Sequence, residues 1–507
     1  MAWTDKRLKG LLFLFYVLIL LRNTWLCEDA YITFRVVDNA VHGLGLRWNP
    51  LERVQVYTHP LWMLCLTVPY FFSRDIYFSA VLLSLACSAL AVWLVLFRGI
   101  RTLIPCLFAA VILTFSKAFV DFSTSGLENP LSHLLLVLFF VEYLKPPEER
   151  RFNRMVWFAG LGITNRMDLI WFFLPALAEL TWTHGYWRPR HFRLWAGLLP
   201  YVAWEVFSLL YYGFLFPNSA YAKLTTDVRG VAFFVQGVYY LINSLSWDPL
   251  TLFTIGSLIL YGFTQGRRDR PVLMLSSGVL LYLFYLLRIG GDYMTGRFLA
   301  APLLVSVLVL SRVELPDKLE IGVAMAAVLG IGFAAPRPPV MTSDGYVSLG
   351  SAVQLVDDER GYRHNDTSLL KLNKERSVQN LGGWVADAHK MRESGAKVSV
   401  YKNIGYYGFF VGPGVHVIDP YGLGDALMSR IPFTERSGFW APGHFYRKVP
   451  DGYAEAAIDA GTIKDPQLAA YWQKLELVTR GPVFGRARLA EVLRFNLGKN
   501  PIPRPAP

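Results

Sequence analysis

Long apolar runs separated by short polar segments dominate the first two thirds of the chain. A helix needs about 20 apolar residues to cross the hydrocarbon core of a bilayer. About eleven runs approach or reach that length, near residues 10–26, 57–73, 76–97, 103–120, 130–145, 155–182, 194–214, 249–264, 271–288, 297–311 and 319–335. The pattern therefore predicts a polytopic α-helical membrane protein with about eleven transmembrane helices.

Three of these segments need separate interpretation. The 155–182 run is too long for one span and is interrupted by the polar segment 164–168, which predicts a helical hairpin. The 57–73 run is short and contains Pro69, so we interpret it as re-entrant or interfacial. The aromatic-rich stretch 231–245 is typical of a helix that lies in the membrane interface.

The last third of the chain has a different pattern, that of a small soluble domain. A proline-rich stretch at 336–339 is the predicted linker. Alternating apolar residues predict strands and longer periods predict helices, with strands at 397–401 and 415–418 and helices at 382–395 and 451–460. The expected fold is thus a membrane domain followed by a C-terminal α/β domain.

Charge predicts the orientation of the chain. The 507 residues carry a net charge of +12, and the basic clusters Arg150–Arg154, Arg188–Arg193 and Arg267–Arg270 fall between apolar runs. Cytoplasmic loops are enriched in such residues, so these clusters predict inside loops rather than nucleic-acid binding. Residues 1–335 then form the transmembrane domain, and residues 336–507 form a domain on the outer, periplasmic side.

Cysteine usage gives no sign of a metal or redox centre. Cys27, Cys65, Cys87 and Cys106 all lie in the first quarter of the chain, and no CxxC motif occurs. We therefore assign no metal ligands and expect no resident cofactor. The sequence leaves open whether a divalent cation takes part.

An acidic pair, Glu28-Asp29, directly follows the first apolar run. Acidic residues at a membrane surface mark functional sites by default. Two adjacent carboxylates also tend to raise the pKa of one of them, which suits a general base. The alternative is that Asp29 only caps the helix that follows. The residues alone leave both interpretations open.

Three further polar segments are expected on the same outer face. They are Thr124–Asn129, Phe216–Lys223 and Arg288–Phe298. In the last of them, paired glycines allow close backbone approach to a ligand. Arg297 could bind a phosphate with two parallel hydrogen bonds, or it could be an interfacial anchor. Carboxylates, arginines and a lysine on one face suit a lipid-phosphate donor and a hydroxyl acceptor.

Together, these motifs resemble a known family. The motifs occur in the order Glu28–Arg35, Gly43–Pro50, Tyr57–Trp62, Thr124–Glu128, Pro217–Lys223, Gly290–Arg297 and, more weakly, Ile418–Asp425 and Gly443–Phe445. This order resembles the bacterial GT-C glycosyltransferases related to the mycobacterial terminal β-(1→2) arabinofuranosyltransferase. The resemblance covers most of residues 10–335.

The resemblance implies a multi-pass enzyme of the bacterial cytoplasmic (inner) membrane. Such an enzyme takes a sugar, here expected to be arabinofuranose, from a polyprenyl-phosphate donor and transfers it to a cell-envelope glycan or glycoprotein. The family's catalytic acid in the first outer loop maps to Asp29. The family often has two aspartates there, so Glu28 is a departure that leaves open which acid is the base. One carboxylate base implies inversion at the anomeric carbon.

The expected site therefore has ten residues. Asp29 and Glu28 are the candidate catalytic acids. Donor or acceptor binding is assigned to Arg35, His59, Glu128, Arg166, Asn218, Lys223, Asp292 and Arg297. A transporter or flippase of lipid-linked sugars is the main alternative, although such proteins usually show internal repeats and we find none.

Overall fold

A computed structural model describes most of the chain, namely residues 3–266, 269–314, 317–346, 356–371, 382–433 and 440–503. The chain divides into two compact units, each assembled from three separate stretches. Unit 1 comprises Met1–Cys27, Ala80–Tyr201 and Gly230–Leu372, and unit 2 comprises Glu28–Ser79, Val202–Arg229 and Asn373–Pro507. Arg267 and Arg268, two members of a predicted basic loop, lie outside the described residues.

Helices form almost all of the regular structure in unit 1. Its α-helices are α1 (Trp3–Arg22), α4 (Ile76–Leu94, which begins in unit 2), α5 (Leu103–Phe115), α6 (Lys117–Asp121), α7 (Asn129–Tyr143), α8 (Phe152–Asn165), α9 (Ile170–His184), α10 (Leu199–Tyr211, which continues into unit 2), α12 (Gly230–Trp247), α13 (Pro249–Gln265), α14 (Arg270–Ile289), α15 (Ala300–Leu310), α16 (Lys318–Ala334) and α17 (Glu359–Thr367). Shorter turns of π- and 3₁₀-helix join them at η1 (Val95–Gly99), η2 (Pro147–Glu149), η3 (Met167–Leu169), η4 (Pro189–Leu198) and η5 (Arg297–Leu299).

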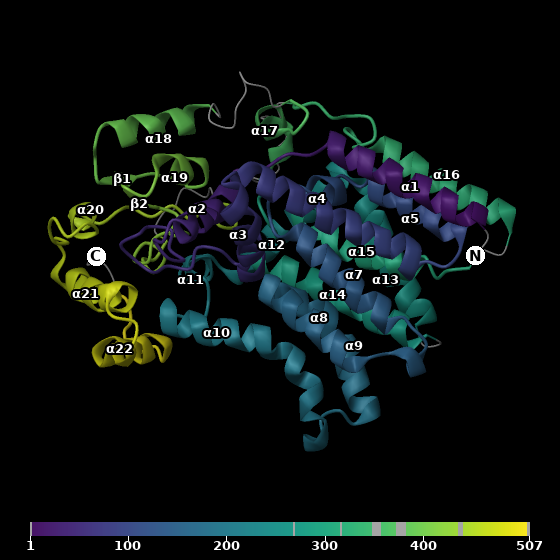
Figure 1. Ribbon diagram of the computed structural model, residues 1–507, viewed down its shortest axis with the longest axis horizontal. Coiled ribbons are helices and arrows are strands. Elements are labelled where there is room, and N and C mark those ends of the chain that lie inside the picture. Colours follow the sequence, from purple (N-terminus) through teal and green to yellow (C-terminus); the bar gives the residue numbers. More distant parts are fainter. Residues whose placement is uncertain are drawn as a thin grey trace. The chain divides into compact units, whose positions relative to one another are not determined.

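The helices of unit 1 pack around one continuous apolar core. Helix α8 lies against α7 and α9, and α14 lies against α9, α12 and α13 (Figure 1). The core side chains come from α1, α4 to α9 and α12 to α16. Helices whose apolar residues occur on every side bury one face in this core and leave other apolar side chains exposed, such as Leu82 and Leu260. This is the pattern expected of helices surrounded by lipid.

Three of the described helical segments are long and apolar enough to cross a membrane. They are Ile76–Gly99, Pro189–Tyr211 and Arg270–Ile289, and four shorter apolar helices accompany them: Pro60–Ser73, Leu103–Phe115, Asn129–Tyr143 and Arg297–Leu310. The apolar helices of a membrane protein are thus present. The count of about eleven spans stays a prediction.

The predicted break in the 155–182 run is confirmed. Helix α8 ends at Asn165, Arg166 has an extended backbone, and the short turn η3 leads into α9 at Ile170. The 57–73 run forms α3, whose 14 residues include Pro69. It is one of four apolar helices shorter than the roughly 20 residues that a full span requires, so whether this segment crosses the membrane stays a prediction.

Buried ion pairs attach the segment after Pro336 to the helices of unit 1. Lys117 on α6 lies 3.0 Å from the carboxylate of Asp358 and also pairs with Asp121. Arg360 on α17 lies 3.3 Å from Asp121. The described residues 336–346 and 356–371 therefore belong to unit 1. The predicted boundary at residue 336 concerns which segments lie in the membrane, so it stays a prediction.

Unit 2 combines short helices with one small sheet. Its elements are α2 (Ala30–Val41), α3 (Pro60–Ser73), α11 (Asn218–Leu224), α18 (Gly383–Glu393), β1 (Val398–Val400), α19 (Tyr406–Val411), β2 (His416–Ile418), α20 (Tyr453–Ala456), α21 (Pro466–Arg480) and α22 (Arg486–Asn496). The two strands are parallel, with Val398 opposite His416 and Val400 opposite Ile418. Helix α19 lies between them in the chain, as a parallel pair requires a crossover connection.

Both predicted strands and the predicted helix at 382–395 are confirmed. The helix predicted at 451–460 is wrong in length, because α20 has only four residues. Asp459 has a positive φ of 58° and Gly461 follows it closely, so the chain turns where the pattern predicted a longer helix.

Buried arginines stabilise unit 2 by donating to backbone carbonyls. Arg447 donates to the carbonyls of Tyr421 and Phe445, both at 2.9 Å. Arg488 donates to those of Val478 at 2.7 Å and Tyr211 at 2.9 Å. Arg447 thereby satisfies loop carbonyls, and Arg488 satisfies carbonyls in the last turns of α21 and α10, which have no partner within their own helices.

Candidate functional site

The ten predicted site residues divide between the two units. Glu128, Arg166, Asp292 and Arg297 belong to unit 1, and Glu28, Asp29, Arg35, His59, Asn218 and Lys223 belong to unit 2. Each unit therefore has its own group of candidate residues.

The acidic turn, Glu28-Asp29, begins unit 2 and gives its two carboxylates different surroundings. Glu28 is buried, and its Oε1 accepts hydrogen bonds from the backbone amides of Gly405 at 2.7 Å and Tyr406 at 3.2 Å. These amides are at the start of α19, where a negative charge is favourable. Glu28 thus caps a helix far away in the sequence.

This cap explains a glycine at position 405. A Cβ atom there would lie 2.1 Å from the backbone oxygen of Glu28 and 2.6 Å from its carboxyl carbon. Real Cβ atoms do not approach so closely, so only glycine lets the α19 amides reach the Glu28 carboxylate.

Asp29 is the residue before α2 and is only partly buried. Its backbone is helical (φ −59°, ψ −26°), and its side chain accepts no capping hydrogen bond from the amides of α2. The capping interpretation of Asp29 therefore lacks the contact that it requires. Of the two carboxylates, Glu28 is held by α19, whereas Asp29 makes no cap.

Arg35 has a structural environment within unit 2. It is buried, donates to the backbone carbonyls of Trp48 at 2.8 Å and Val415 at 3.1 Å, and lies 4.4 Å above the Trp48 ring. Burial lowers the pKa of its guanidinium to about 9. These contacts hold the turn after α2 against the segment that leads into β2. The predicted role of Arg35 in ligand binding stays a prediction.

Asn218 is likewise committed to the fold of unit 2. Its amide donates to the carbonyls of Gly422 at 2.8 Å and Asp425 at 2.9 Å, and its oxygen accepts from the Ser429 hydroxyl at 2.9 Å. These bonds attach the start of α11 to the 422–429 loop.

His59 and Lys223 complete the predicted set in unit 2. His59 is buried, and its Nε2 lies 2.8 Å from the hydroxyl of Thr33 on α2. Lys223 is exposed on α11. Their predicted roles in binding also stay predictions.

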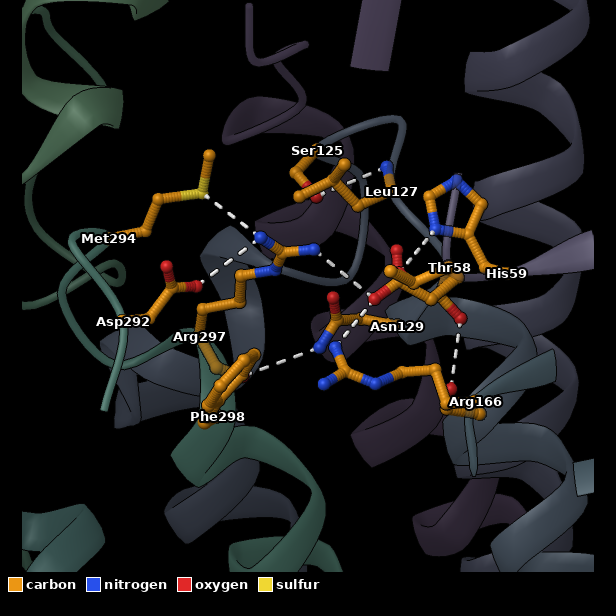
Figure 2. A network of polar contacts seen from close by, with 12 residues as sticks. Thr58, His59, Ser125, Leu127, Asn129, Arg166, Asp292, Met294, Arg297 and Phe298 are labelled. Carbon is orange, nitrogen blue, oxygen red and sulfur yellow. Dashed lines mark hydrogen bonds and ion pairs between the residues drawn. The ribbon is translucent and has the colours of Figure 1, made fainter. Parts of the chain in front are cut away.

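In unit 1 the four predicted residues meet in one ion-pair network, which we call the Glu128 cluster: Glu128, Arg166, Asp168, Asp292 and Arg297. Arg166 lies 2.6 Å from Glu128 and binds Asp168 with two nitrogens, at 2.8 and 2.5 Å. Arg297 lies 3.2 Å from the same Glu128 oxygen and 3.3 Å from Asp292 (Figure 2).

Local sequence explains how these side chains converge. Glu128 immediately precedes α7, Arg166 lies at the extended break between α8 and η3, and Arg297 begins η5. Gly291 and Gly296 flank the Asp292 segment with φ of 71° and 77°. Added Cβ atoms would meet the Tyr240 side chain at 2.6 Å and that of Ala118 at 3.0 Å. Glycine therefore permits both this backbone conformation and close packing around the cluster.

The two arginines are bound with different strength. Burial opposes the charge on Arg166, but the carboxylates of Asp168 and Glu128 outweigh it, and the pKa of the guanidinium lies well above its usual value. Arg297 has the same 11% side-chain exposure, and its contacts to Glu128 and Asp292 are longer, at 3.2 and 3.3 Å. Both guanidinium groups also lie near the Phe298 ring, at 4.6 Å for Arg166 and 5.7 Å for Arg297. Arg297 is therefore the arginine that can more readily exchange a carboxylate for another anion.

Asp168 was not among the predicted site residues. Its carboxylate supplies the two-pronged contact to Arg166. The signal was present as the Arg166-x-Asp168 spacing at the tip of the predicted hairpin.

The chain was compared with protein families, solved structures and curated proteins. No family model matches the chain. Among solved structures, ArnT from Cupriavidus metallidurans bound to undecaprenyl phosphate aligns with a TM-score of 0.46 and 14% identity, over 85% of this chain and 78% of ArnT.

Two curated proteins are similar in sequence, and both are terminal β-(1→2) arabinofuranosyltransferases. That of Mycobacterium tuberculosis is 27% identical over 526 aligned residues, which cover 85% of this chain and 82% of the relative. That of Corynebacterium glutamicum is 29% identical over 344 residues, covering 57% of this chain and 48% of the relative. The predicted resemblance is therefore confirmed, and the chain is similar to these glycosyltransferases along most of its length.

Proposed function

We propose that the chain is a membrane glycosyltransferase that transfers arabinofuranose from a polyprenyl-phosphate donor to a cell-envelope glycan or glycoprotein. The observation that carries this proposal is the similarity to the mycobacterial arabinofuranosyltransferase over 85% of the chain. The apolar helices support it, because a polyprenyl donor must be bound at a membrane.

The contacts of the acidic turn favour different roles for its two acids, with Asp29 as the base and Glu28 as a helix cap. The transfer needs a base on the acceptor hydroxyl. Asp29 takes this role in the proposal, because the Glu28 carboxylate already accepts two hydrogen bonds from α19. A carboxylate committed to a helix start is poorly placed to accept a proton and release it in each cycle.

The proposed reaction is a single displacement at the anomeric carbon of the donor sugar. The acceptor oxygen loses its proton to Asp29 and forms a bond to the anomeric carbon. The bond between that carbon and the phosphate oxygen breaks, and polyprenyl phosphate leaves as an anion. No cofactor is required, because polyprenyl phosphate is itself a good leaving group.

The Glu128 cluster supplies a cation for phosphate in the proposal. Arg297 is held by contacts of 3.2 and 3.3 Å, so a donor phosphate can replace one of its carboxylate partners. A guanidinium binds phosphate with two parallel hydrogen bonds, which a lysine cannot reproduce. Arg166 keeps Glu128 in position while this exchange occurs.

A single displacement inverts the anomeric carbon, so the stereochemistry can be tested with matched donors. If the product is β-linked, as the names of the relatives describe, inversion requires an α-linked donor. We expect transfer from the α-linked and not from the β-linked polyprenyl phosphate. Use of the β-linked donor would require retention and a second nucleophile.

The function itself is tested with the purified full-length chain in detergent. Polyprenyl-phosphate arabinofuranose and an arabinan oligosaccharide are supplied, and extension of the oligosaccharide by one residue is measured by mass spectrometry. A flippase would instead move the lipid across reconstituted vesicles without extending the oligosaccharide, and that result would contradict the proposal.

The proposal also requires the C-terminal region to lie outside the cytoplasm. Reporter fusions after Pro336 and at the C-terminus should report a periplasmic location. Cytoplasmic signals from both fusions would contradict the assigned orientation.

A further inference from the structure

Three side chains of types that bind metal ions meet inside unit 2. Glu52, His416 and Asp425 each offer one atom, and these atoms all lie within 4.8 Å of one another. All three residues are buried, with 0%, 4% and 0% of their surface exposed. This set, the three-ligand cluster, includes none of the ten residues assigned to the transfer reaction.

The fold brings the three residues together from distant parts of the sequence. Glu52 lies in the turn after α2, His416 begins β2, and Asp425 lies in the loop that follows it. Asn49 pairs both backbone groups of Val417, donating to its carbonyl at 3.0 Å and accepting from its amide at 3.1 Å. This pairing holds the Glu52 turn beside β2.

The cluster holds polar atoms whose hydrogen-bonding capacity is unused. Among the described residues, Oε2 of Glu52 and Nδ1 of His416 are buried without a hydrogen-bond partner. The nearest donor to the other Glu52 oxygen is the Asn49 amide, at 3.5 Å. A buried, unsatisfied carboxylate oxygen is costly, and two buried carboxylates side by side repel each other.

The charges of Arg480 and Arg430 act on Glu52 from a distance, but the direct contacts of these arginines are to other groups. Arg480 pairs with Asp459 and Glu476, both at 2.9 Å, and Arg430 donates to the carbonyl of Ala426 and to Asn218. In the described part of the chain, no salt bridge reaches Glu52 or Asp425. A divalent cation between the two carboxylates would neutralise them and give the unused atoms a partner.

We propose that Glu52, His416 and Asp425 bind one divalent transition-metal ion, with Zn²⁺ preferred. An imidazole together with two carboxylates suits zinc better than calcium or magnesium, which prefer oxygen ligands alone. Zinc–ligand bonds of about 2.0–2.2 Å place ligand atoms roughly 3.3 Å apart, so small side-chain movements close the site.

Neighbouring groups orient one ligand, as metal sites require. Asp425 accepts from the Met428 amide at 2.8 Å and from the Tyr453 hydroxyl at 2.9 and 3.0 Å. Such hydrogen bonds fix the rotamer of a carboxylate ligand. The ion joins the turn after α2 to the β2 loop, and thereby stabilises unit 2.

The test uses the full-length chain, treated with chelator and titrated with Co²⁺ or Zn²⁺ while absorbance and metal content are measured. We expect one bound ion per chain and a higher melting temperature with Zn²⁺. His416→Ala should weaken binding at least about 100-fold, and Tyr453→Phe about 10–100-fold. Asp451→Asn, which alters an exposed acid of the same unit, should bind like the wild type.

Two outcomes would overturn the proposal. One is no bound Co²⁺ or Zn²⁺ at equimolar concentration, which would mean that the two acids share a proton instead. The other is equal affinity in the wild type and Tyr453→Phe. The Tyr453→Phe variant keeps the ring packed and all three ligands in place, so it remains informative if His416→Ala fails to fold.

Discussion

The acidic turn of unit 2 and the Glu128 cluster of unit 1 both hold carboxylates, but they use them differently. In the acidic turn, the two adjacent acids have different hydrogen-bonding environments, because Glu28 caps α19 and Asp29 makes no cap. In the Glu128 cluster, three acids from three segments are all paired with two arginines.

The difference shows that the contacts of a carboxylate decide whether it can act as a base or can only hold other groups in position. A carboxylate paired with arginine or with helix amides is held in place, so it can orient other groups but is poorly placed to act as a base. A partly exposed carboxylate without a cap can accept and release a proton. By this criterion Asp29 is the candidate base, and Glu128 is a support for the two arginines.

The largest expected effect on stability comes from Glu128. Glu128→Gln removes the charge that both arginines share in a buried site, and breaking a buried pair costs about 3–5 kcal/mol. We expect a clear fall in the melting temperature of the detergent-solubilised protein. Glu149→Gln, which alters an exposed acid of η2 in the same unit, is the control and should change it little. Equal melting temperatures for the two variants would contradict the supporting role.

The two arginines of the cluster should respond differently to the same change. Arg297→Lys should lower kcat/KM for the donor about tenfold or more, because a point charge cannot reproduce a two-pronged phosphate contact. Arg166→Lys should instead lower the melting temperature, since Arg166 makes the two-pronged contact to Asp168. Titration of initial rates with donor separates the two effects. Unchanged kinetics in Arg297→Lys would make Arg297 an interfacial anchor.

The smallest expected effect on transfer comes from Glu28. Glu28→Gln keeps an oxygen that can accept from the α19 amides but removes its charge, so stability should fall by about 0.5–2 kcal/mol. The maximal rate should remain within about threefold of the wild type, because a positioned base contributes far more than that. Thermal melting and kcat are measured on the same preparation. An inactive but folded Glu28→Gln would move the catalytic role to Glu28.

Much of the architecture followed from local patterns. The hairpin break at Arg166 and both strands of unit 2 were predicted, because polar interruptions and alternation are visible within a few residues. The length of α20 was not, because a left-handed turn at Asp459 overrides the helical pattern.

The sequence suggested which charged residues come together, but not the long-range contacts that each residue makes. The motifs predicted Glu128, Arg166, Asp292 and Arg297 for one face, and these four residues do meet, but their roles in binding stay predictions. They could not show that Glu28 caps a helix 377 positions later, or that Glu52 meets His416. Such contacts depend on how distant loops pack, and no sequence period encodes that.

The central claim is that Asp29 is the base for transfer, and its most direct test is the single-turnover rate of Asp29→Asn. Asparagine keeps the shape of the side chain but cannot take a proton. We expect a fall of about 10²–10⁴-fold in the rate of oligosaccharide extension. The melting temperature should be unchanged, because Asp29 makes no capping bond. A folded Asp29→Asn variant that extends the oligosaccharide at the wild-type rate would contradict the claim.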